Sequence, residues 1–346
     1  MLENSVLNEE LIKKIVSDDY GIEVTNVNHI NRGSANIYNL DNKYILKEFS
    51  SNRSKESIEK EYNIIKHLDN KGLLVPTYVE TKDNKCYTKY EGRIIILQIY
   101  LDGYTMENNT GDYEKVIESA TILGRLTKAL EDYPLESKYE DWTSKEELEK
   151  GIEKLTDLIN KIKEDNPYKD KIISDLNRRV EISKELLNFN FEELKKVSLK
   201  LCHGDYSVQQ LIYNDKKTAV IDFETVRKMP IVWEIIRSYS YIDKECKDGK
   251  FNLSTFIDYV KEVMKYINLT EYDLKYMPYI YIFQLVSSTF GYKQYNNDYS
   301  KTSLLDFAFF RTNLCNYLYD NLENISKELL KLNTKIVYKR NLGFIR

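Results

Sequence analysis

The sequence predicts an α+β protein in which a small, strand-rich N-terminal part precedes a larger, mainly helical part. Short segments of period-two character alternate with polar and small-residue turns up to residue 101, as in an antiparallel meander. Beyond residue 103, apolar residues recur at i, i+3 and i+4, which is typical of amphipathic helices. Residues 199–224 return to short apolar runs inside the helical part. These three observations carry the prediction of the fold class.

The composition is that of a globular protein long enough for two domains. The 346 residues include 51 basic and 55 acidic ones, which are interspersed and give a net charge of −4. The absence of a basic stripe argues against a nucleic-acid partner. No apolar run reaches the roughly 18 residues of a membrane span, and the N-terminus lacks the blocks of a signal peptide. With four dispersed cysteines, we expect reduced thiols and a cytoplasmic location.

The N-terminal meander begins with three expected strands. They are separated by the turn R-G-S-A-N and by a second turn, Asp41-Asn42. Small residues such as Gly33 and Ser34 let backbone N–H groups approach the oxygens of a phosphate. The first turn is therefore a candidate phosphate-binding loop.

The third strand carries a lysine among apolar neighbours. On a strand, Lys47 shares a face with Ile45 and Phe49, and a charge there needs a partner. The following segment, residues 55–68, has helical periodicity, and Glu61 falls beside its apolar stripe. Glu59, the alternative partner, points about 200° away around that helix. We expect Glu61 to pair with Lys47.

The meander ends in a nearly unbroken apolar run, residues 94–101, followed by Asp102-Gly103. With residues 77–81 and 86–90, this run completes a sheet of about five strands. The helical part then includes residues 112–130 and a helical hairpin at 141–190, whose two arms are separated at Asn166-Pro167. Thr270 and Asp273 form a candidate capping box at the start of a later helix.

The stretch 199–224 holds the chemistry. It reads L-K-L-C-H-G-D-Y-S-V-Q-Q-L-I-Y-N-D-K-K-T-A-V-I-D-F-E, and its apolar runs predict short buried strands joined by a polar turn. Asp205 precedes the resulting hairpin and Asp222 lies at its end, so we expect both on one wall of a cleft. Paired carboxylates of this kind suit phosphoryl transfer, in which one accepts a hydroxyl proton and the other holds Mg²⁺.

The motif H-G-D-x-x-x-x-Q, followed by I-D-F-E, resembles the H-x-D-x-x-x-x-N and I-D-x-[DE] signature of the aminoglycoside phosphotransferase and choline kinase superfamily. The resemblance extends from Gly33 to Trp233 and implies a protein-kinase-like fold. Such a fold has a small N-lobe with a five-stranded antiparallel sheet plus a helix, and a larger, mainly helical C-lobe. Gln210 departs from the pattern, which has Asn there. Its carbonyl oxygen lies one methylene farther out, whereas Mg²⁺ demands near-ideal geometry.

The resemblance also implies a role for each residue that matches the motif. Asp205 is the expected catalytic base, His203 is expected to hydrogen-bond the backbone near Asp222, and Glu234 is expected to fix the core loop by hydrogen bonds. The expected ligands are as follows: ATP phosphates at Gly33, Ser34, Lys47 and Glu61; adenine at Gln98, Ile99, Tyr100 and Leu101; Mg²⁺ at Asp222 and Gln210. Glu224, Tyr206 and Trp233 are candidate contacts of the acceptor substrate, and packing between helices is the alternative for the two aromatic residues.

The function implied is ATP- and Mg²⁺-dependent transfer of the γ-phosphoryl group to a hydroxyl of a small molecule, such as an aminoglycoside or choline-like amino alcohol. Residues 1–100 would form the nucleotide-binding N-lobe, and residues 101–346 the C-lobe with the catalytic loop and acceptor site. The insertion 141–190 would border that site. A kinase-fold protein with weak or no catalysis, as in a spore coat, is the alternative, and Gln210 favours it.

Overall fold

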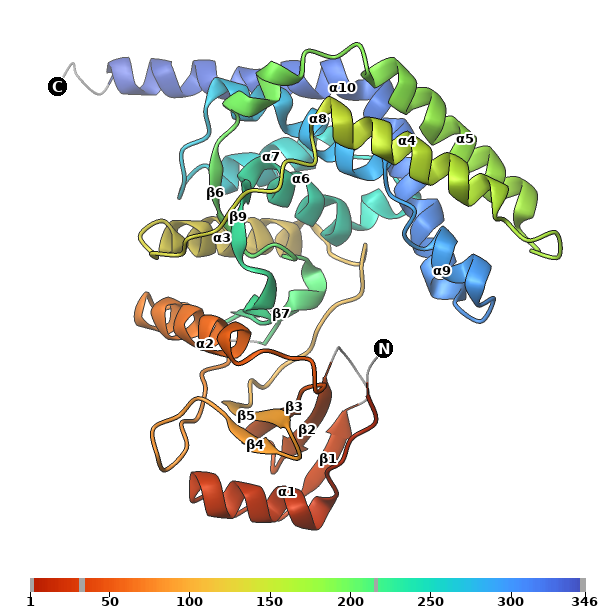
Figure 1. Cartoon of the computed structure of the whole chain (residues 1–346). Helices are drawn as coiled ribbons and strands as arrows, with labels where there is room; N and C mark the ends of the chain where they lie inside the picture. Colours follow the sequence, from red (N-terminus) through yellow and green to blue (C-terminus); the bar gives the residue numbers. More distant parts are fainter. Residues whose placement is uncertain (1–2, 31–34, 215–216, 343–346) are drawn as a thin grey trace. The chain divides into compact units, whose positions relative to one another are not determined.

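A computed structural model describes residues 3–30, 35–214 and 217–342 (Figure 1). The chain divides into two compact units. The first contains Met1–Met106, Asp132–Pro134 and Gln209–Val226, and the second contains the remaining segments. The units therefore interleave along the chain. The division of the chain into an N-lobe at residues 1–100 and a C-lobe at residues 101–346 stays a prediction.

The first unit is built on a five-stranded antiparallel sheet, as the sequence predicted. The strands lie in the order β1-β2-β3-β5-β4, and every neighbouring pair is antiparallel. The expected strand at residues 77–81 is wrong, because this segment contributes only an isolated bridge from Tyr78 to Gln98. The elements preceding or forming the sheet are α1 (Glu9–Ile15), the π-helical turn η1 (Val16–Tyr20), β1 (Val27–Ile30), β2 (Asn36–Leu40), β3 (Tyr44–Glu48), α2 (Lys55–Asn70), β4 (Thr88–Tyr90) and β5 (Arg93–Ile99).

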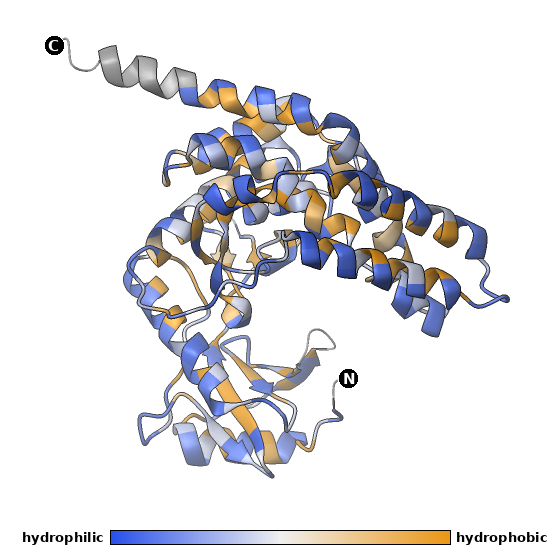
Figure 2. Ribbon diagram, turned by 45° about the horizontal axis from the view of Figure 1, so that its top comes forward, coloured by the Kyte–Doolittle hydropathy of each residue, from blue (hydrophilic) through white to orange (hydrophobic). Residues whose placement is uncertain are grey.

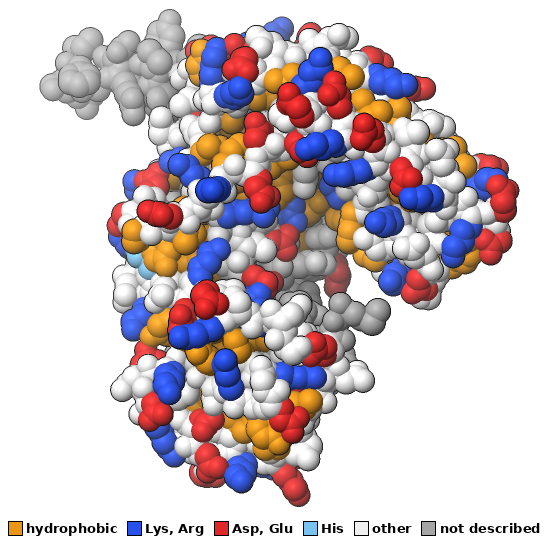
Figure 3. Space-filling model, viewed as in Figure 1, with side chains coloured by type: hydrophobic (Ala, Val, Ile, Leu, Met, Phe, Trp, Pro, Cys, Tyr) orange, Lys and Arg blue, Asp and Glu red, His pale blue; other side chains and the backbone are white. Residues whose placement is uncertain are grey.

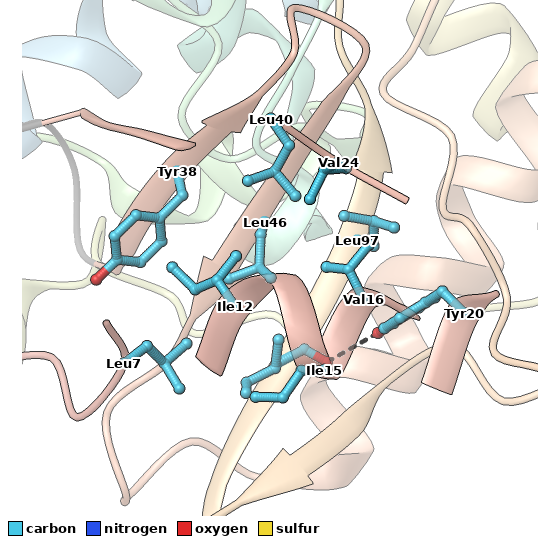
Figure 4. Packing of buried hydrophobic residues seen from close by; sticks show 11 residues of the cluster. Leu7, Ile12, Ile15, Val16, Tyr20, Val24, Tyr38, Leu40, Leu46 and Leu97 are labelled. Carbon is cyan, nitrogen blue, oxygen red and sulfur yellow. Dashed lines mark hydrogen bonds between the residues drawn. The ribbon is translucent and has the colours of Figure 1, made fainter. Parts of the chain in front are cut away.

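One face of the sheet packs against the N-terminal helix. Figure 4 shows side chains of α1 and η1 meeting those of the strands, with the Tyr20 hydroxyl donating to the carbonyl oxygen of Ile95. Leu46 of β3 is fully buried in this cluster. Because side chains alternate along a strand, Lys47 projects from the opposite face. The hydrophobic core thus fixes the side of the sheet on which Lys47 lies.

The opposite face is covered by α2. This helix begins at the N-cap Ser54, whose hydroxyl accepts from the amide of Ser57, and it buries Ile58 against Phe49 and Ile96. Ile45, Lys47 and Phe49 share this face, as predicted, and all three line one cavity.

A short hairpin far along the chain completes the first unit. Strands β7 (Leu211–Ile212) and β8 (Ala219–Val220) pair antiparallel, and the 3-10 turn η4 (Phe223–Thr225) follows. The amide of Val220 donates to the carbonyl oxygen of Leu74, which attaches the hairpin to the N-terminal segment. The 3-10 turn η3 (Val208–Gln210) leads into the hairpin.

The second unit is mainly helical. A two-stranded sheet pairs β6 with β9, so the run 199–202 pairs outside the predicted hairpin. Its elements are α3 (Tyr113–Leu130), α4 (Lys145–Asn160), α5 (Lys169–Leu186), η2 (Phe191–Lys196), β6 (Leu199–Cys202), β9 (Arg227–Pro230), α6 (Ile231–Ile242), η5 (Lys244–Asp248), α7 (Leu253–Val263), α8 (Glu271–Val286), α9 (Tyr292–Asn297) and α10 (Thr302–Leu342).

Helices α4 and α5 form the predicted helical hairpin and lie side by side (Figure 1). Hydrophilic and hydrophobic residues alternate along both helices in Figure 2. Their apolar faces are buried with α9 and α10, so the hairpin belongs to the core of this unit. Arg179 of α5 is buried and donates to the carbonyl oxygens of Leu285 and Ser288, which ties α5 to the end of α8.

The capping box predicted at the start of α8 is confirmed, because Thr270 and Asp273 exchange both of its hydrogen bonds. Acidic and basic side chains alternate over the face shown in Figure 3, in keeping with the interspersed charges of the sequence. Among the described helices, none has both the length and the apolar character needed to cross a bilayer.

Candidate active site

A cavity of about 770 Å³ lies within the first unit. Its size and mixed polar and apolar lining are those of a small-molecule site. Strand β3, helix α2, the end of β5 and the β7–β8 hairpin all contribute. The residues predicted from sequence that line it are Lys47, Glu61, Gln98, Ile99, Tyr100, Leu101, Gln210, Asp222 and Glu224.

Lys47 and Glu61 reach the same cavity without forming a direct ion pair. The side chain of Lys47 makes no ion pair or hydrogen bond with any other residue that the structure describes. Glu61 is 3% exposed, and burial raises the pKa of its carboxyl group, whereas the charge of Lys47 acts in the opposite direction. The two charges are thus close enough to interact, while the ammonium group faces the cavity.

The direct partner of Glu61 is Arg53, which sequence reasoning missed. Its Nη2 atom lies 3.7 Å from Oε2 of Glu61, and its Nη1 atom pairs with Glu224. The guanidinium also stacks over the ring of Phe49, 5.1 Å from the centroid. Arg53 therefore pairs with two carboxylates that line the cavity. No local pattern marks it, because Glu224 is 171 positions away in the chain.

Asp222 and Gln210 are held side by side by the hairpin. The amide of Ile221 donates to the carbonyl oxygen of Gln210 at 3.0 Å, and both Asp222 and Gln210 line the cavity. Asp222 has φ +67° and ψ 68°, a left-handed conformation that is uncommon for residues other than glycine. Such strained positions cluster at functional sites. The backbone thus directs an acidic side chain and an amide side chain toward one cavity.

The end of β5 carries a buried hydrogen-bond donor that is not used within the described residues. The Nε2 atom of Gln98 is buried without a partner among the described residues. The amides of Ile99 and Tyr100 donate to the carbonyl oxygens of Thr77 and Lys43, so they are already occupied. Gly103 follows with φ +144°, and a Cβ atom there would lie 2.3 Å from the carbonyl oxygen of Tyr213. Only glycine allows this approach of the chain to the hairpin.

Two predicted phosphate-binding residues, Gly33 and Ser34, lie outside the described residues. Asp205 belongs to the second unit, whereas Asp222 belongs to the first. The prediction that they share the wall of a cleft therefore stays a prediction.

A buried glutamate accepts hydrogen bonds from the loop that carries Asp205. Glu234 of α6 is 1% exposed, and its two carboxylate oxygens accept from the amides of His203 and Gly204 at 3.0 and 2.6 Å. Burial raises the pKa of Glu234, and the neighbouring His203 and the two amides act against that rise. The structural role predicted for Glu234 is confirmed. His203 is buried, and its Nδ1 atom accepts from the amide of Asp205.

Arg237 contacts Asp205 directly and was also missed from the sequence. Its Nη2 atom lies 2.5 Å from Oδ1 of Asp205, and its Nη1 atom donates to the carbonyl oxygen of Tyr206. The side chain of Asp205 is nevertheless 43% exposed. The spacing of Arg237, three residues after Glu234 on one helix, is the signal that could have identified it.

The aromatic residues proposed for the acceptor are engaged in packing. The ring of Tyr206 is fully buried, and its hydroxyl donates to the carbonyl oxygen of Ser119. Trp233 and Tyr241 are each 4% exposed and stack against Arg237. The space between these rings therefore already holds a cation of the protein itself.

Comparisons with known proteins place this geometry in a family. A family model described as "Phosphotransferase enzyme family" matches residues 27–253. A search of curated proteins found no significant match.

Several solved structures have the same fold. An aminoglycoside phosphotransferase from Alicyclobacillus acidocaldarius is 13% identical with a TM-score of 0.67, covering 94% of this chain and 98% of its own. Spectinomycin phosphotransferase, solved with ADP and spectinomycin, is 15% identical with a TM-score of 0.63 and coverage of 94% and 100%. Amicoumacin kinase, solved with AMP-PNP and Ca²⁺, is 16% identical with a TM-score of 0.59 and coverage of 90% and 94%.

These similarities confirm the protein-kinase-like fold and agree with the resemblance carried by the sequence motifs. The family model covers Lys47, residues 98–101, the H-G-D loop and the I-D-F-E segment. The chain belongs to the phosphotransferase enzyme family.

Proposed function

We propose that the protein transfers the γ-phosphoryl group of ATP to a hydroxyl group of a small molecule. One observation carries the proposal: in a member of a phosphotransferase family, Lys47, Glu61, Gln210 and Asp222 line one cavity of about 770 Å³. A cation together with carboxylate and amide oxygens is the set that phosphoryl transfer uses to hold a nucleotide and its metal.

ATP would bind with its adenine against the segment Gln98–Leu101 and its phosphates toward Lys47. The unpartnered Nε2 of Gln98 fits a polar ligand edge, because a buried donor without a partner is costly. Since the amides of Ile99 and Tyr100 are occupied, Leu101 is the residue of this segment that we expect to donate its amide to the base. Gly33 and Ser34 remain proposed contributors to phosphate binding. Two structural neighbours were solved in complex with adenine nucleotides, ADP and AMP-PNP, which supports the choice of ATP.

The residues of the hairpin fit a magnesium ion. Asp222 offers a carboxylate and Gln210 an amide oxygen, and Mg²⁺ usually takes one or two protein oxygens beside phosphates and waters. When bound, the ion would neutralise charge on the transferred phosphoryl group. Arg53 holds Glu224 at the rim, which leaves Asp222 as the acidic side chain of this segment without an ion pair in the described structure.

Asp205 would act as the general base for the acceptor hydroxyl. Arg237 holds one of its oxygens, and the side chain keeps substantial exposure to solvent, so an acceptor hydroxyl could reach the carboxylate. His203 would support the loop through the amide of Asp205 rather than take the proton itself.

The acceptor we propose is an aminoglycoside, an amino alcohol or a similar hydroxylated small molecule in the cytoplasm. Structural neighbours named for spectinomycin and amicoumacin support this class. Residues 101–346 would provide the acceptor site, with the insertion 141–190 at its border. The second candidate is a kinase-fold protein with weak catalysis and a binding role, for example in a spore coat, and Gln210 is the observation that favours it.

The test is an ATP-consumption screen with Mg²⁺ over aminoglycosides, amino alcohols and sugars. We expect at least one acceptor to give phosphorylated product by mass spectrometry, and Asp222→Ala to abolish it. A protein that binds Mg-ATP yet phosphorylates nothing would support the second candidate. Absence of any heat when Mg-ATP is titrated into the protein would remove the enzyme proposal altogether.

A further inference from the structure

We propose that Arg237 is a positioning residue for Asp205, held in place by an aromatic clamp made of Trp233 and Tyr241. The inference rests on the proposed function, because it concerns how the proposed base is oriented. All of these residues belong to the second unit, and α6 carries the arginine and both rings.

The guanidinium grips the loop at two adjacent points. Its Nη2 atom pairs with Oδ1 of Asp205, and its Nη1 atom donates to the carbonyl oxygen of Tyr206 at 3.0 Å. The arginine side chain is only 13% exposed. A planar fork that bonds two neighbouring oxygens fixes both position and direction, which a point charge could not do. Holding one oxygen of Asp205 fixes the plane of the whole carboxylate relative to the loop.

The clamp follows from helical spacing. Trp233 lies four residues before Arg237 and Tyr241 four residues after it, so all three side chains share one face of α6. The guanidinium carbon lies 5.1 Å from the ring centroid of Trp233 and 4.7 Å from that of Tyr241. These are distances at which a cation is attracted to the face of an aromatic ring.

Other elements support both rings from behind. The ring of Trp233 meets that of Trp142 edge to face at 5.9 Å, and Tyr241 packs against Phe307 and Phe310 of α10. The positions of the Trp233 and Tyr241 rings are therefore fixed by their contacts with Trp142, Phe307 and Phe310 as well as by Arg237. A buried cation held between two supported rings has little freedom to leave Asp205.

Two charged residues of α6, Glu234 and Arg237, contact the loop that carries Asp205. Glu234 holds the amides of His203 and Gly204, whereas Arg237 holds the side chain and the carbonyl group that follow. Glu234 thus fixes the backbone of the loop at His203 and Gly204, and Arg237 fixes the orientation of the Asp205 carboxylate.

The experiment is a double-mutant cycle with Arg237→Gln and Asp205→Asn. With an acceptor found in the screen, we expect Arg237→Gln to lower kcat by roughly tenfold to a hundredfold, as a misplaced catalytic group does, and to leave the KM for ATP within about twofold. Arg237→Lys should recover part of kcat, because it restores the charge without the fork. In the Asp205→Asn background, Arg237→Gln should cause no further loss of kcat.

Arg178→Gln is the matched control. Arg178 of α5 also stacks on one tyrosine and pairs with acidic residues, but it is 39% exposed and contacts other parts of the unit. We expect its kcat and KM to equal those of the wild type. Equal losses of kcat from Arg237→Gln in both backgrounds would mean that Arg237 acts only through the fold, and would overturn the proposal.

The same four proteins give a readout that needs no activity. If the pair forms, the melting temperature of the double variant should be no lower than that of the Arg237→Gln single variant, whereas additive losses would refute the pairing. A wild-type protein without transfer to any acceptor would reject the proposed function, yet this thermal cycle would still decide whether Arg237 and Asp205 are coupled. Arg237→Lys serves in the cycle if Arg237→Gln does not fold.

Discussion

Replacing Arg53 by methionine tests the charge arrangement at the edge of the cavity. Methionine keeps an unbranched apolar side chain over the ring of Phe49 but removes the guanidinium that faces Glu61 and Glu224. Glu61 is 3% exposed, so in the variant its carboxylate is buried and the charge of Lys47 still acts on it. We expect the variant to be less stable than the wild type.

The expected loss follows from the distance and the burial. Two unit charges about 4 Å apart interact by about 4 kcal/mol at an effective dielectric constant of 20, and removing one partner of a buried pair costs about 3–5 kcal/mol. Because the charge of Lys47 also acts on Glu61, part of that cost is offset. We therefore expect the free energy of unfolding at pH 7 to fall by about 2–3 kcal/mol.

The loss should depend on pH in a defined direction. Burial raises the pKa of Glu61 in the folded state above its ordinary value of 4.5, and removing Arg53 raises the pKa further. A raised carboxyl pKa means that the folded state binds the proton more tightly than the unfolded chain. Stability is then highest at low pH and falls as the pH rises through the folded pKa. The difference between wild type and variant should grow from pH 5 to pH 7.

The assay is urea unfolding followed by circular dichroism at both pH values, with Arg53→Met, Glu61→Gln and the double variant. Lys55→Met is the control, because Lys55 pairs with Glu59 on the same helix but both side chains are largely exposed. Its free energy of unfolding should stay near that of the wild type. A loss that is equal at pH 5 and pH 7, or additive in the double variant, would refute the reasoning.

Three further predictions concern the proposed chemistry and its support. Asp222→Ala should abolish the Mg²⁺-dependent heat of ATP binding in a calorimetric titration, and undiminished heat would exclude Asp222 as a metal ligand. Asp205→Asn should keep ATP affinity while kcat falls by about 10²–10⁴, the usual contribution of a general base, so unchanged turnover would remove that role. Glu234→Gln should lower the free energy of unfolding by about 1–3 kcal/mol, because the amides of His203 and Gly204 would lose one of their two acceptor oxygens. An unaltered urea midpoint in this variant would contradict the support that we assign to Glu234.

Features with a local period or a fixed motif could be predicted from the sequence. The alternation along β3 placed Lys47 on the face opposite Leu46, and the fold confirms this because Leu46 lies in the buried cluster. The capping box of α8 and the support given by Glu234 were predictable for the same reason: the interacting groups are close in sequence or joined by one motif.

Contacts across long stretches of chain were not predictable. Arg53 pairs with Glu224 only because the hairpin returns to the first unit, and nothing near Arg53 in sequence indicates this. Tyr206 illustrates the opposite difficulty. Its position next to Asp205 suggested the acceptor site, but neighbours on a loop can face opposite ways, and its ring is fully buried against α3.

The chain leaves the first unit after Met106, returns briefly at Asp132–Pro134 between α3 and α4, and comes back at Gln209–Val226 before leaving again. During synthesis, the ribosome must therefore release more than half of the polypeptide before the first unit can acquire Gln210 and Asp222. A recombinant fragment ending at Met106 would contain Lys47 but lack Gln210 and Asp222. We therefore expect the fragment alone not to bind a complex of ATP and Mg²⁺. The nucleotide binding that we propose would therefore depend on segments that are synthesised late.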